Sequence, residues 1–450
     1  MTWTSASVRA ALDLPARSGP DLSYSGVSTD TRSLLDGALF VAIAGERFDG
    51  HAHLAEAAAG GALGAVVRVG TPPCPGLELF EVPDTVVALG WLARARRRQM
   101  SGPVVAVTGT NGKTSTKEML AAALRTRFRV HATRANLNNL IGVPLTILEA
   151  PADAEALVVE AGASEPGEIR RCRQIIEPTV AVVTNVAAGH LEGFGTLDGV
   201  LAEKLSLVEG VALAVVGTEP PALTAGARRL ARRVVTAGLE NAELRPQSVT
   251  LDPGGRATVE TDQARFTLPL PGRHLAANAM LAWAVAVHLG LDPRAVARAL
   301  ERLEIPGGRG QVVEAGGLTI LNDCYNANPL SFRAAMATAQ AMRGGRRLVF
   351  VAGTMRELGG ESAALHEAVA RDLVALRPDL LAAVGEFVPA LEAYRQELGD
   401  RLVVAGDVPA LGEALSRRLE GGELVVLKAS RGVALERIIP FLTPRAAHGS

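Results

Sequence analysis

A lysine and a threonine stand at the end of a short glycine-rich stretch, and together they could bind the phosphates of a nucleotide. The apolar run VVAV (104–107) leads into Gly109-Thr110-Asn111-Gly112-Lys113-Thr114-Ser115. A strand that enters such a loop and a helix that leaves it present backbone N–H groups at the positive end of the helix, where polyphosphate binds. Lys113 would contact the β- and γ-phosphates, and the Thr114 hydroxyl would be a ligand of Mg²⁺. Val107 stands where the full Walker A pattern has glycine, so a tighter loop is predicted; a chance turn is the alternative.

Two further residues with suitable chemistry follow apolar runs. Glu160 ends the run ALVVE (156–160), and His190 comes a few residues after TVAVVTN (179–185). The carboxyl ends of parallel strands meet at one edge of a sheet, where ligands of such folds bind. Both residues are therefore predicted at the nucleotide edge, with Glu160 as a carboxylate that faces magnesium. A solvated strand end for Glu160 and a structural role for His190 are the open alternatives.

The use of lysine is uneven in this chain. Of the 46 basic residues only four are lysines, namely Lys113, Lys117, Lys204 and Lys428. A G+C-rich coding bias accounts for the overall ratio, but arginine cannot replace lysine where a compact ammonium or a nucleophilic amine is needed. Lys117, three residues past Thr114, is predicted on the exposed surface of a helix, pointing away from the phosphates. Taken alone, Lys204 would cap or decorate its helix.

The apolar runs predict the elements that position these residues, in three α/β domains at 1–100, 101–308 and 309–450. In the first domain, strands are predicted at 37–45 and 61–70 and a helix at 85–100. In the second, continuous apolar runs predict a mostly parallel sheet of mononucleotide-binding type, with strands at 104–108, 156–160, 179–185 and 212–217. The segment 256–272 alternates and predicts antiparallel strands, and 274–290 predicts a long helix. The third domain is predicted to be Rossmann-like, with strands at 318–323, 346–353, 379–386, 401–407 and 423–430.

Composition limits the function. The chain has 450 residues and a formal net charge of −1, so nothing indicates a nucleic-acid binder. Three cysteines without C-x-x-C spacing indicate neither a disulfide framework nor a zinc site. The N-terminal MTWTSASVRAALDL lacks a signal pattern, and no apolar run is long enough to cross a bilayer. We therefore expect a reduced, cytoplasmic protein without membrane insertion, and a monomer.

Taken together, the motifs resemble those of the Mur ligases of peptidoglycan synthesis along nearly the whole chain. In family order they are VSTDTRS (27–33), GERFDGH (45–51), TGTNGKTSTKE (108–118), NLNNLIGVP (136–144), VVEAGASEPGEI (158–169), TNVAAGHLEGFG (184–195), LAEK (201–204), NDCYNANP (322–329) and LKASRG (427–432). TSTKE and NANP resemble the member of the family that adds D-Ala-D-Ala. Each motif alone is a weak signal, whereas their number and order make the resemblance specific.

The resemblance implies an ATP-dependent amide ligase of cell-wall precursor synthesis. Its first domain would bind the UDP-MurNAc end of one substrate, its second would bind ATP, and its third would complete the ligase site. ATP would phosphorylate the C-terminal carboxylate of UDP-MurNAc-tripeptide, and the amine of D-Ala-D-Ala would attack the acyl phosphate and expel phosphate. A carboxylate is a poor electrophile and needs this activation, and the two anions that meet require positive charge from Mg²⁺ and lysine.

The resemblance also assigns metal and phosphate contacts to individual residues. Thr114 and Glu160 would bind a first Mg²⁺, and His190 and Lys204 a second. For that role Lys204 would be carbamylated by CO₂, which turns its amine into a carboxylate-like anion. Lys113 and Asn139 would lie near the transferring phosphoryl group.

The remaining assignments concern the nucleotide and the other substrates. For the nucleotide, the resemblance implies Asn278, near His274, as the adenine reader and Arg309, Asp323 and Tyr325 as contacts to phosphate, ribose and base. Candidate substrate contacts are Ser28, Thr29, Asp30, Thr31 and Arg32 at the uridine end, and Asn326, Asn328, Lys428, Ser430 and Arg431 at the peptide end. The two asparagines could equally be turn formers before Pro329.

The chain departs from the family pattern at three positions. Thr354 replaces an acidic residue in GTMRELG (353–359), Ala429 replaces a glycine, and Leu275 replaces an asparagine. A sibling Mur ligase or a folylpolyglutamate synthetase stays an alternative, although the latter usually has glycine where this chain has Thr114. A regulatory nucleotide-binding module is a third alternative, but it would not need Glu160, His190 and Lys204 together.

Overall fold

The computed structural model describes residues 3–45 and 48–442. The chain divides into two compact units of mixed α/β structure. Unit 1 comprises Met1–Ala106, Phe128–Ala163 and Gly167–Thr179, and unit 2 comprises Val107–Arg127, Ser164–Pro166 and Val180–Ser450. Glu46 and Arg47, which belong to the motif GERFDGH, lie outside the described residues. In the described ranges, no helix combines the length and the apolar character that crossing a membrane requires.

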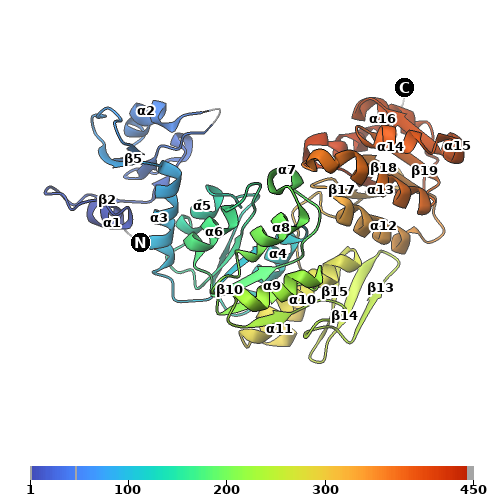
Figure 1. The fold of residues 1–450 in the computed structure, drawn as a ribbon, viewed down its shortest axis with the longest axis horizontal. Helices are drawn as coiled ribbons and strands as arrows, with labels where there is room; N and C mark the ends of the chain where they lie inside the picture. Colours follow the sequence, from blue (N-terminus) through green and yellow to red (C-terminus); the bar gives the residue numbers. More distant parts are fainter. Residues whose placement is uncertain (1–2, 46–47, 443–450) are drawn as a thin grey trace, which may run out of the picture. The chain divides into compact units, whose positions relative to one another are not determined.

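The N-terminal part of unit 1 is a parallel four-stranded sheet with the order β3-β4-β5-β6 (Figure 1, blue). Its elements are β1 (Trp3–Thr4), α1 (Ser5–Ala11), β2 (Ser23–Tyr24), β3 (Val27–Ser28), β4 (Leu39–Val41), α2 (Leu54–Ala59), β5 (Gly64–Arg68), β6 (Glu78–Val82) and α3 (Thr85–Arg97). Apolar side chains of the sheet, α1 and α3 form one core because alternate strand residues face the helices. The strands predicted at 37–45 and 61–70 and the helix predicted at 85–100 are confirmed by β4, β5 and α3.

The rest of unit 1 contributes the strand that ends at Glu160. Its elements are β8 (Val130–Ala132), α5 (Gly142–Leu148), β9 (Ala156–Glu160) and α6 (Glu168–Ile176). β8 and β9 pair in parallel, and β9 is buried along its whole length. A strand buried on both faces must be apolar throughout, which is why ALVVE shows no alternation.

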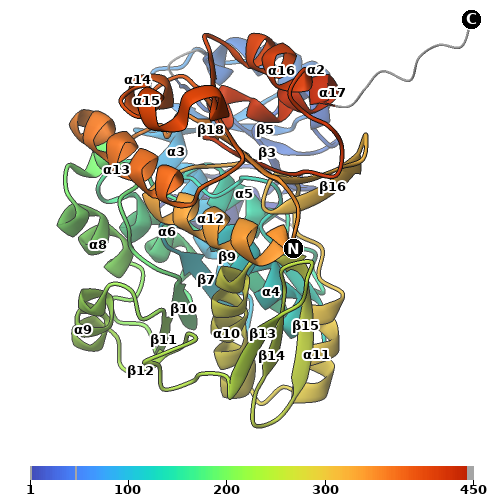
Figure 2. The same ribbon diagram turned by 90° about the vertical axis from the view of Figure 1, so that its right-hand side faces the viewer.

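The first half of unit 2 carries the glycine-rich loop. β7 (Val104–Thr108) leads into it, and the elements that follow the loop are α4 (Lys113–Leu124), β10 (Val180–Val183), α7 (Leu191–Phe194), α8 (Leu197–Leu205), β11 (Leu213–Val216), α9 (Pro221–Leu230) and β12 (Val234–Thr236). β10, β11 and β12 pair in parallel. An antiparallel sheet of β13 (Ser248–Leu251), β14 (Arg256–Glu260) and β15 (Arg265–Pro271) follows, with α10 (Arg273–His288) and α11 (Pro293–Glu301) beside it (Figure 2).

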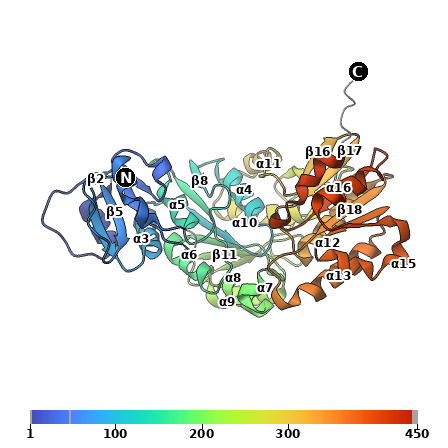
Figure 3. The same cartoon turned by 90° about the horizontal axis from the view of Figure 1, so that it is seen from above.

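The second half of unit 2 is a six-stranded sheet covered by helices on both faces (Figure 3). Its elements are β16 (Gln311–Ala315), β17 (Leu318–Asp323), α12 (Pro329–Arg343), β18 (Leu348–Gly353), α13 (Ser362–Ala375), β19 (Leu380–Val384), α14 (Phe387–Glu392), α15 (Arg395–Leu398), β20 (Leu402–Ala405), α16 (Val408–Ser416), β21 (Leu424–Lys428) and α17 (Ile439–Leu442). The order is β16-β17-β21-β18-β19-β20, parallel except for the edge strand β16. Phe350 packs towards α12 and α13, whereas its neighbours Val349 and Val351 pack towards α16.

The strands and helices predicted for residues 101–308 and 309–450 are confirmed. Strands occur at all four positions predicted for the central sheet, and 256–272 forms the antiparallel pair β14–β15. The long helix predicted at 274–290 is α10, and the five strands predicted for the last domain are β17 to β21. The domain boundaries at 100 and 308 stay a prediction.

Candidate functional site

The glycine-rich loop leads from β7 into α4 and has the predicted strand–loop–helix form. Gly109 has φ 146° and Gly112 has φ 77°, values that glycine adopts without steric cost. A side chain at Gly109 would also collide with Thr184, whose Oγ1 lies 1.9 Å from the place of a Cβ. Val107 is fully buried in β7, so the position that is glycine in the Walker pattern belongs to the strand in this chain. The loop therefore begins at Gly109.

Lys113, Thr114 and Ser115 lie in the first turn of α4. Lys113 is the first residue of the helix and is half-buried, and its Nζ donates to the carbonyl oxygens of Gly109 at 2.9 Å and Thr110 at 3.2 Å. Thr114 and Ser115 are buried in the first turn. The ammonium thus lies back over the loop, at the helix end whose free N–H groups attract anions.

The segment that follows β10 holds the loop in shape. The Thr110 N–H donates to the Asn185 carbonyl at 2.9 Å, and the Asn111 N–H donates to the Asn185 side-chain oxygen at 3.1 Å. The Thr184 hydroxyl donates to the Asn111 carbonyl at 2.5 Å. Backbone groups of the loop are therefore satisfied by residues more than 70 positions away.

Residues predicted to bind the nucleotide gather around this loop. Asn278, on α10, is buried against Gly112, where a Cβ would lie 2.7 Å from its Oδ1. Arg309 donates from Nη2 to the Thr114 hydroxyl at 3.3 Å, and its guanidinium carbon lies 3.4 Å from the centre of the Tyr325 ring. The structure thus brings four predicted nucleotide residues together, namely Thr114, Asn278, Arg309 and Tyr325.

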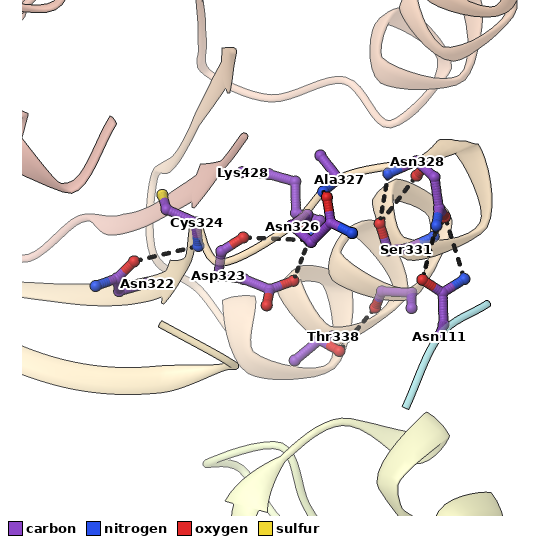
Figure 4. Close-up of polar contacts among 11 residues, drawn as sticks. Asn111, Asn322, Asp323, Cys324, Asn326, Ala327, Asn328, Ser331, Thr338 and Lys428 are labelled. Carbon is purple, nitrogen blue, oxygen red and sulfur yellow. Dashed lines mark hydrogen bonds and ion pairs between the residues drawn. The ribbon is translucent and has the colours of Figure 1, made fainter. Parts of the chain in front are cut away.

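Asp323 and Lys428 form a buried ion pair at the carboxyl ends of β17 and β21 (Figure 4). Lys428 is 1% exposed, and its Nζ lies 2.8 Å from Asp323 Oδ2. The same ammonium donates to the backbone carbonyls of Asp323 at 3.1 Å and Asn326 at 2.6 Å. Three oxygens therefore surround Lys428, which in this structure organises the segment after β17.

Ser430, Arg431 and Asn326 lie at the same end of the sheet. Ser430 is buried and ties to the loop after β18, because its Oγ accepts from the Arg356 N–H at 2.9 Å. Arg431 is exposed, and its guanidinium lies 5.8 Å from the Tyr325 ring centre. Asn326 is also exposed, so its side chain is accessible for a ligand.

His190 contacts a residue that the sequence did not single out. Its Nδ1 lies 2.7 Å from Oε2 of Glu357, in the loop after β18. The hydrogen bond to His190, with a smaller effect from the charge of Lys113, holds the pKa of Glu357 below its usual value. Both residues have positive φ, 56° for His190 and 64° for Glu357, which non-glycine residues adopt at a cost and mostly at functional sites. The sequence signal that could have identified Glu357 is its place in the motif GTMRELG (353–359).

Two buried lysines lie on helices of unit 2. Lys204, on α8, is 1% exposed, and its Nζ lies 5.5 Å from the centre of the Phe194 ring. Lys117, on α4, is 2% exposed and pairs with Glu118. The prediction that Lys117 lies on the exposed helix surface is wrong. α10 and α11 pack against α4, so Lys117 is interior, although it lies one helical turn beyond Thr114.

Glu160 and Asn139 belong to unit 1, as does Asn138, which sequence reasoning missed. Glu160 is 2% exposed, and its Oε1 accepts from the Asn138 side chain at 2.9 Å. Its Oε2 is buried and has no hydrogen-bond partner among the described residues. Asn139 Oδ1 accepts from the N–H groups of Ile141 and Gly142, so its oxygen stabilises the start of α5. The adjacent asparagines therefore have different tasks.

The segment predicted for the uridine end, Ser28 to Arg32, lies at the surface of unit 1. Arg32 binds the Asp30 carboxylate through its side chain and its backbone N–H. These bonds lower the pKa of Asp30 to about 2. Thr31 donates to Glu56 at 2.8 Å, and the Ser28 hydroxyl bonds the backbone of Asp30. Thr29, between them, is half-buried.

The three departures from the family pattern fit without backbone strain. Ala429 is absent from the residues with positive φ in the described chain, and its methyl group packs where Gly353 leaves room, 2.8 Å from the place of a Cβ there. Leu275 is buried at the start of α10. Thr354 accepts the Glu386 N–H at 3.0 Å.

Within residues 3–45 and 48–442, no three histidine, cysteine, aspartate or glutamate side chains lie in metal-binding geometry. The predicted magnesium ligands are of another composition, because Glu160 and His190 are joined in that set by a threonine and by a lysine that would need carbamylation.

Comparison with known proteins gives the class of protein. The family model "Mur ligase middle domain" matches residues 107–286, and the model "Mur ligase, glutamate ligase domain" matches residues 308–431. The chain therefore belongs to the Mur ligase family.

Individual relatives of the chain belong to one group within this family. The UDP-N-acetylmuramoyl-tripeptide–D-alanyl-D-alanine ligase of Bacillus subtilis (strain 168) is 34% identical over 430 residues, which cover 93% of each chain. A crystal structure of MurF from Acinetobacter baumannii is similar with a TM-score of 0.87 and 29% identity, covering 99% of both chains. The MurF ligase of Thermotoga maritima in complex with ADP has a TM-score of 0.82 and 30% identity, covering 93% of this chain and 96% of that one.

Proposed function

We propose that this chain joins D-alanyl-D-alanine to the C-terminal carboxylate of UDP-MurNAc-tripeptide, with ATP as the energy source and an acyl phosphate as the intermediate. The observation that carries the proposal is the match along nearly the whole chain to ligases of that name, at 34% identity over 93% of both sequences. The geometry supports it, because the glycine-rich loop, the buried Asn278 and the stack of Arg309 on Tyr325 lie together in unit 2.

The residues of the chain account for the first step. The loop 109–112 and the start of α4 bind the polyphosphate through backbone N–H groups, and Lys113 supplies charge where the terminal phosphoryl group leaves ADP. Arg309 reaches the same helix turn through its bond to Thr114. Two anions, the terminal phosphate and the substrate carboxylate, must approach each other, and these cations offset their repulsion. In the second step the dipeptide amine attacks the acyl carbon, a tetrahedral intermediate forms, and phosphate leaves with the activated oxygen.

Magnesium fits the residues that the family assigns to it. Glu160 has a buried carboxylate oxygen without a hydrogen-bond donor, and a buried anionic oxygen of this kind is stabilised by a cation. Thr114, Glu160, His190 and Lys204 would hold the two ions. Mg²⁺ would supply charge neutralisation for the phosphates and polarise the transferred phosphoryl group.

A carbamate at Lys204 would change the charge of a buried position. The uncharged amine adds to CO₂ and releases a proton, which converts a cation into an anion with oxygen donors that suit Mg²⁺. Lys204 is almost fully buried, so a carbamate there would be shielded from bulk water. Arginine cannot undergo this reaction.

The other parts of the proposal concern the substrate end and the setting. Ser28 to Arg32 would contact the uridine-muramoyl moiety, and Asn326 is the exposed candidate for the dipeptide. We further propose a monomer that acts in the cytoplasm, where ATP and the nucleotide-linked substrate would meet. Size-exclusion chromatography with light scattering tests the monomer, and a dimer mass at working concentration would contradict it.

The test of function is phosphate release from ATP by the purified full-length chain. Full turnover should require both UDP-MurNAc-tripeptide and D-Ala-D-Ala, and parallel reactions with meso-diaminopimelate, lysine or ornithine at the third position would define the tripeptide. Turnover with folate and glutamate instead would assign the chain to folylpolyglutamate synthesis. Turnover with a shorter UDP-MurNAc-peptide and a single amino acid would make it a sibling ligase. Nucleotide binding without turnover on any pair would favour a regulatory module.

A further inference from the structure

Two asparagines 217 residues apart form a reciprocal pair of hydrogen bonds between the phosphate loop and the start of α12. Asn111 Nδ2 donates to Asn328 Oδ1 at 3.1 Å, and Asn328 Nδ2 donates to Asn111 Oδ1 at 2.7 Å (Figure 4). Both carboxamides are therefore oriented by each other, and neither bond survives if one side chain is shortened.

Asn328 has little capacity left for a substrate. It is 3% exposed, and its Oδ1 accepts a second bond from the Ser331 N–H at 2.9 Å, which caps α12. Ser331 in turn accepts the Asn328 N–H at 2.9 Å. Both lone pairs of the amide oxygen are used, and the amide nitrogen faces Asn111. The neighbour Asn326 is exposed, and although its Oδ1 accepts the Ala327 N–H at 2.8 Å, its side chain is not enclosed by a second asparagine.

Asn111 is held equally firmly on the other side. Its N–H donates to Asn185, and its carbonyl accepts the hydroxyl of Thr184. Gly189, next to His190, completes the contact, because a Cβ there would lie 2.9 Å from Thr110 and 3.6 Å from Asn328. The pair thus rests on the segment that carries His190 as well as on the phosphate loop.

The segment from Asp323 to Asn328 is anchored at both of its ends. At its start, Lys428 binds Asp323 and the Asn326 carbonyl, and at its end Asn328 caps α12. In between, Tyr325 stacks on Arg309, which contacts Thr114. The segment therefore contacts the phosphate loop directly through Asn328, and it reaches the first turn of α4 indirectly, through the stack of Tyr325 on Arg309.

We propose that the Asn111–Asn328 pair is a coupling contact, through which docking of the segment 323–328 positions the phosphate loop and its nucleotide for transfer. Asn328 is then a positioning residue that acts through Asn111 and does not bind the dipeptide. This deepens the proposed function and rests on it, because the same segment carries Asn326, the candidate contact for the dipeptide.

The first test measures ADP binding by calorimetry, without either of the other substrates. The variants are Asn111→Ala, Asn328→Ser and the double variant; serine keeps the cap of α12 but is too short to reach Asn111. We expect each single variant to weaken ADP binding up to about tenfold, and the double variant to weaken it no further, because one interaction is removed in all three. Unchanged affinity, or independent losses that multiply in the double variant, would overturn the proposal.

Ser331→Ala is the matched control, because it weakens the cap and leaves the asparagine pair in place. It should lower the thermal midpoint and keep the ADP affinity. If it weakens ADP binding as much as Asn328→Ser does, folding of α12 explains the effect and the coupling is refuted.

The second test separates coupling from substrate contact by steady-state kinetics. Asn328→Ser and Asn111→Ala should both lower kcat up to about tenfold and leave the KM for D-Ala-D-Ala within about twofold. A raised dipeptide KM at constant kcat in Asn328→Ser alone would make Asn328 a substrate contact and would overturn the inference. Absence of turnover in the wild type refutes the proposed function instead, and the ADP measurements stand independently of it.

Discussion

Replacing Glu160 by glutamine should raise stability and weaken binding of the proposed first Mg²⁺ in the same variant. The Glu160 carboxylate is 2% exposed, Oε1 accepts from Asn138, and Oε2 has no hydrogen-bond partner among the described residues. Glutamine has the same shape and keeps an oxygen for Asn138, but it carries no charge. The perturbation therefore removes a buried, half-satisfied anion and changes little else.

The size of the effect follows from these contacts. An unsatisfied buried polar atom costs about 1–3 kcal/mol, and a charged one costs more. A gain of about 1–2 kcal/mol for Glu160→Gln corresponds to a rise in Tm of about 2–8 °C for units of this size. In the wild type, a ligand that binds only the folded state adds about 2.7 kcal/mol at 100 times its Kd. The variant should lose the part of this stabilisation that depends on Mg²⁺.

The assay is thermal unfolding with and without Mg²⁺, in the presence and absence of ADP. Asp153→Asn is the control, because Asp153 is an exposed carboxylate in the same unit that pairs with Arg129 at the surface; the Tm of this variant should change little. A Glu160→Gln variant that melts below the wild type without ligands would refute the argument from the unpaired oxygen. A variant with an undiminished Mg²⁺-dependent shift would refute the assignment of Glu160 as a ligand.

The other expected outcomes concern lysines and one surface carboxylate. Lys204→Ala should lose turnover and regain part of it in added short-chain carboxylate, whereas an active or unrescued variant would count against a carbamate. Lys117→Ala should destabilise the chain by about 1–3 kcal/mol in denaturant unfolding, because it removes a side chain that is 2% exposed and its pair with the partly exposed Glu118; a change as small as that of an exposed residue would contradict its burial. In Arg32→Ala the pKa of Asp30, followed by NMR, should rise from about 2 towards the ordinary value of 3.8. Because the folded pKa is depressed, the interaction is present above the unfolded pKa and is lost as pH falls towards 2; an unchanged Asp30 pKa in the variant would exclude Arg32 as the cause.

The arrangement of strands and helices could be predicted from the sequence because its signals are local. Strands such as ALVVE and RRLVFVAG are apolar throughout, since both faces of their sheets are covered, and the helices between them follow at regular spacing. The phosphate loop was predictable for the same reason, because its glycines and Lys113 are adjacent in the chain. Thr114 follows from the loop pattern, whereas Arg309 and Tyr325 are implied by the family resemblance, and the contacts among these three residues agree with a shared site.

The contacts of the site could not be predicted where they join distant residues. The motif makes Asn328 a candidate contact for the dipeptide or a turn former before Pro329, and nothing in the sequence indicates that its amide contacts Asn111. The pair of His190 and Glu357 depends on two residues with positive φ, each in a different loop. Lys117 is a further example on a helix. The spacing of residues predicts which face of α4 carries Lys117, but the packing of α10 and α11 against α4 decides whether that face is buried.

The structure shows the surroundings of the four lysines, which say more about why lysine occurs at these positions than their small number does. Lysine is ordinarily among the most exposed residue types, yet Lys117, Lys204 and Lys428 are 1–2% exposed and Lys113 lies over the phosphate loop. At Lys428 three oxygens surround one ammonium at 2.6–3.1 Å, an arrangement that a planar guanidinium with five fixed donors does not match. Coding bias explains why surface positions are arginine. It does not explain why three of the four lysines are buried, and we expect a compact ammonium at Lys428 and a reactive amine at Lys204 to be the reason at those two positions.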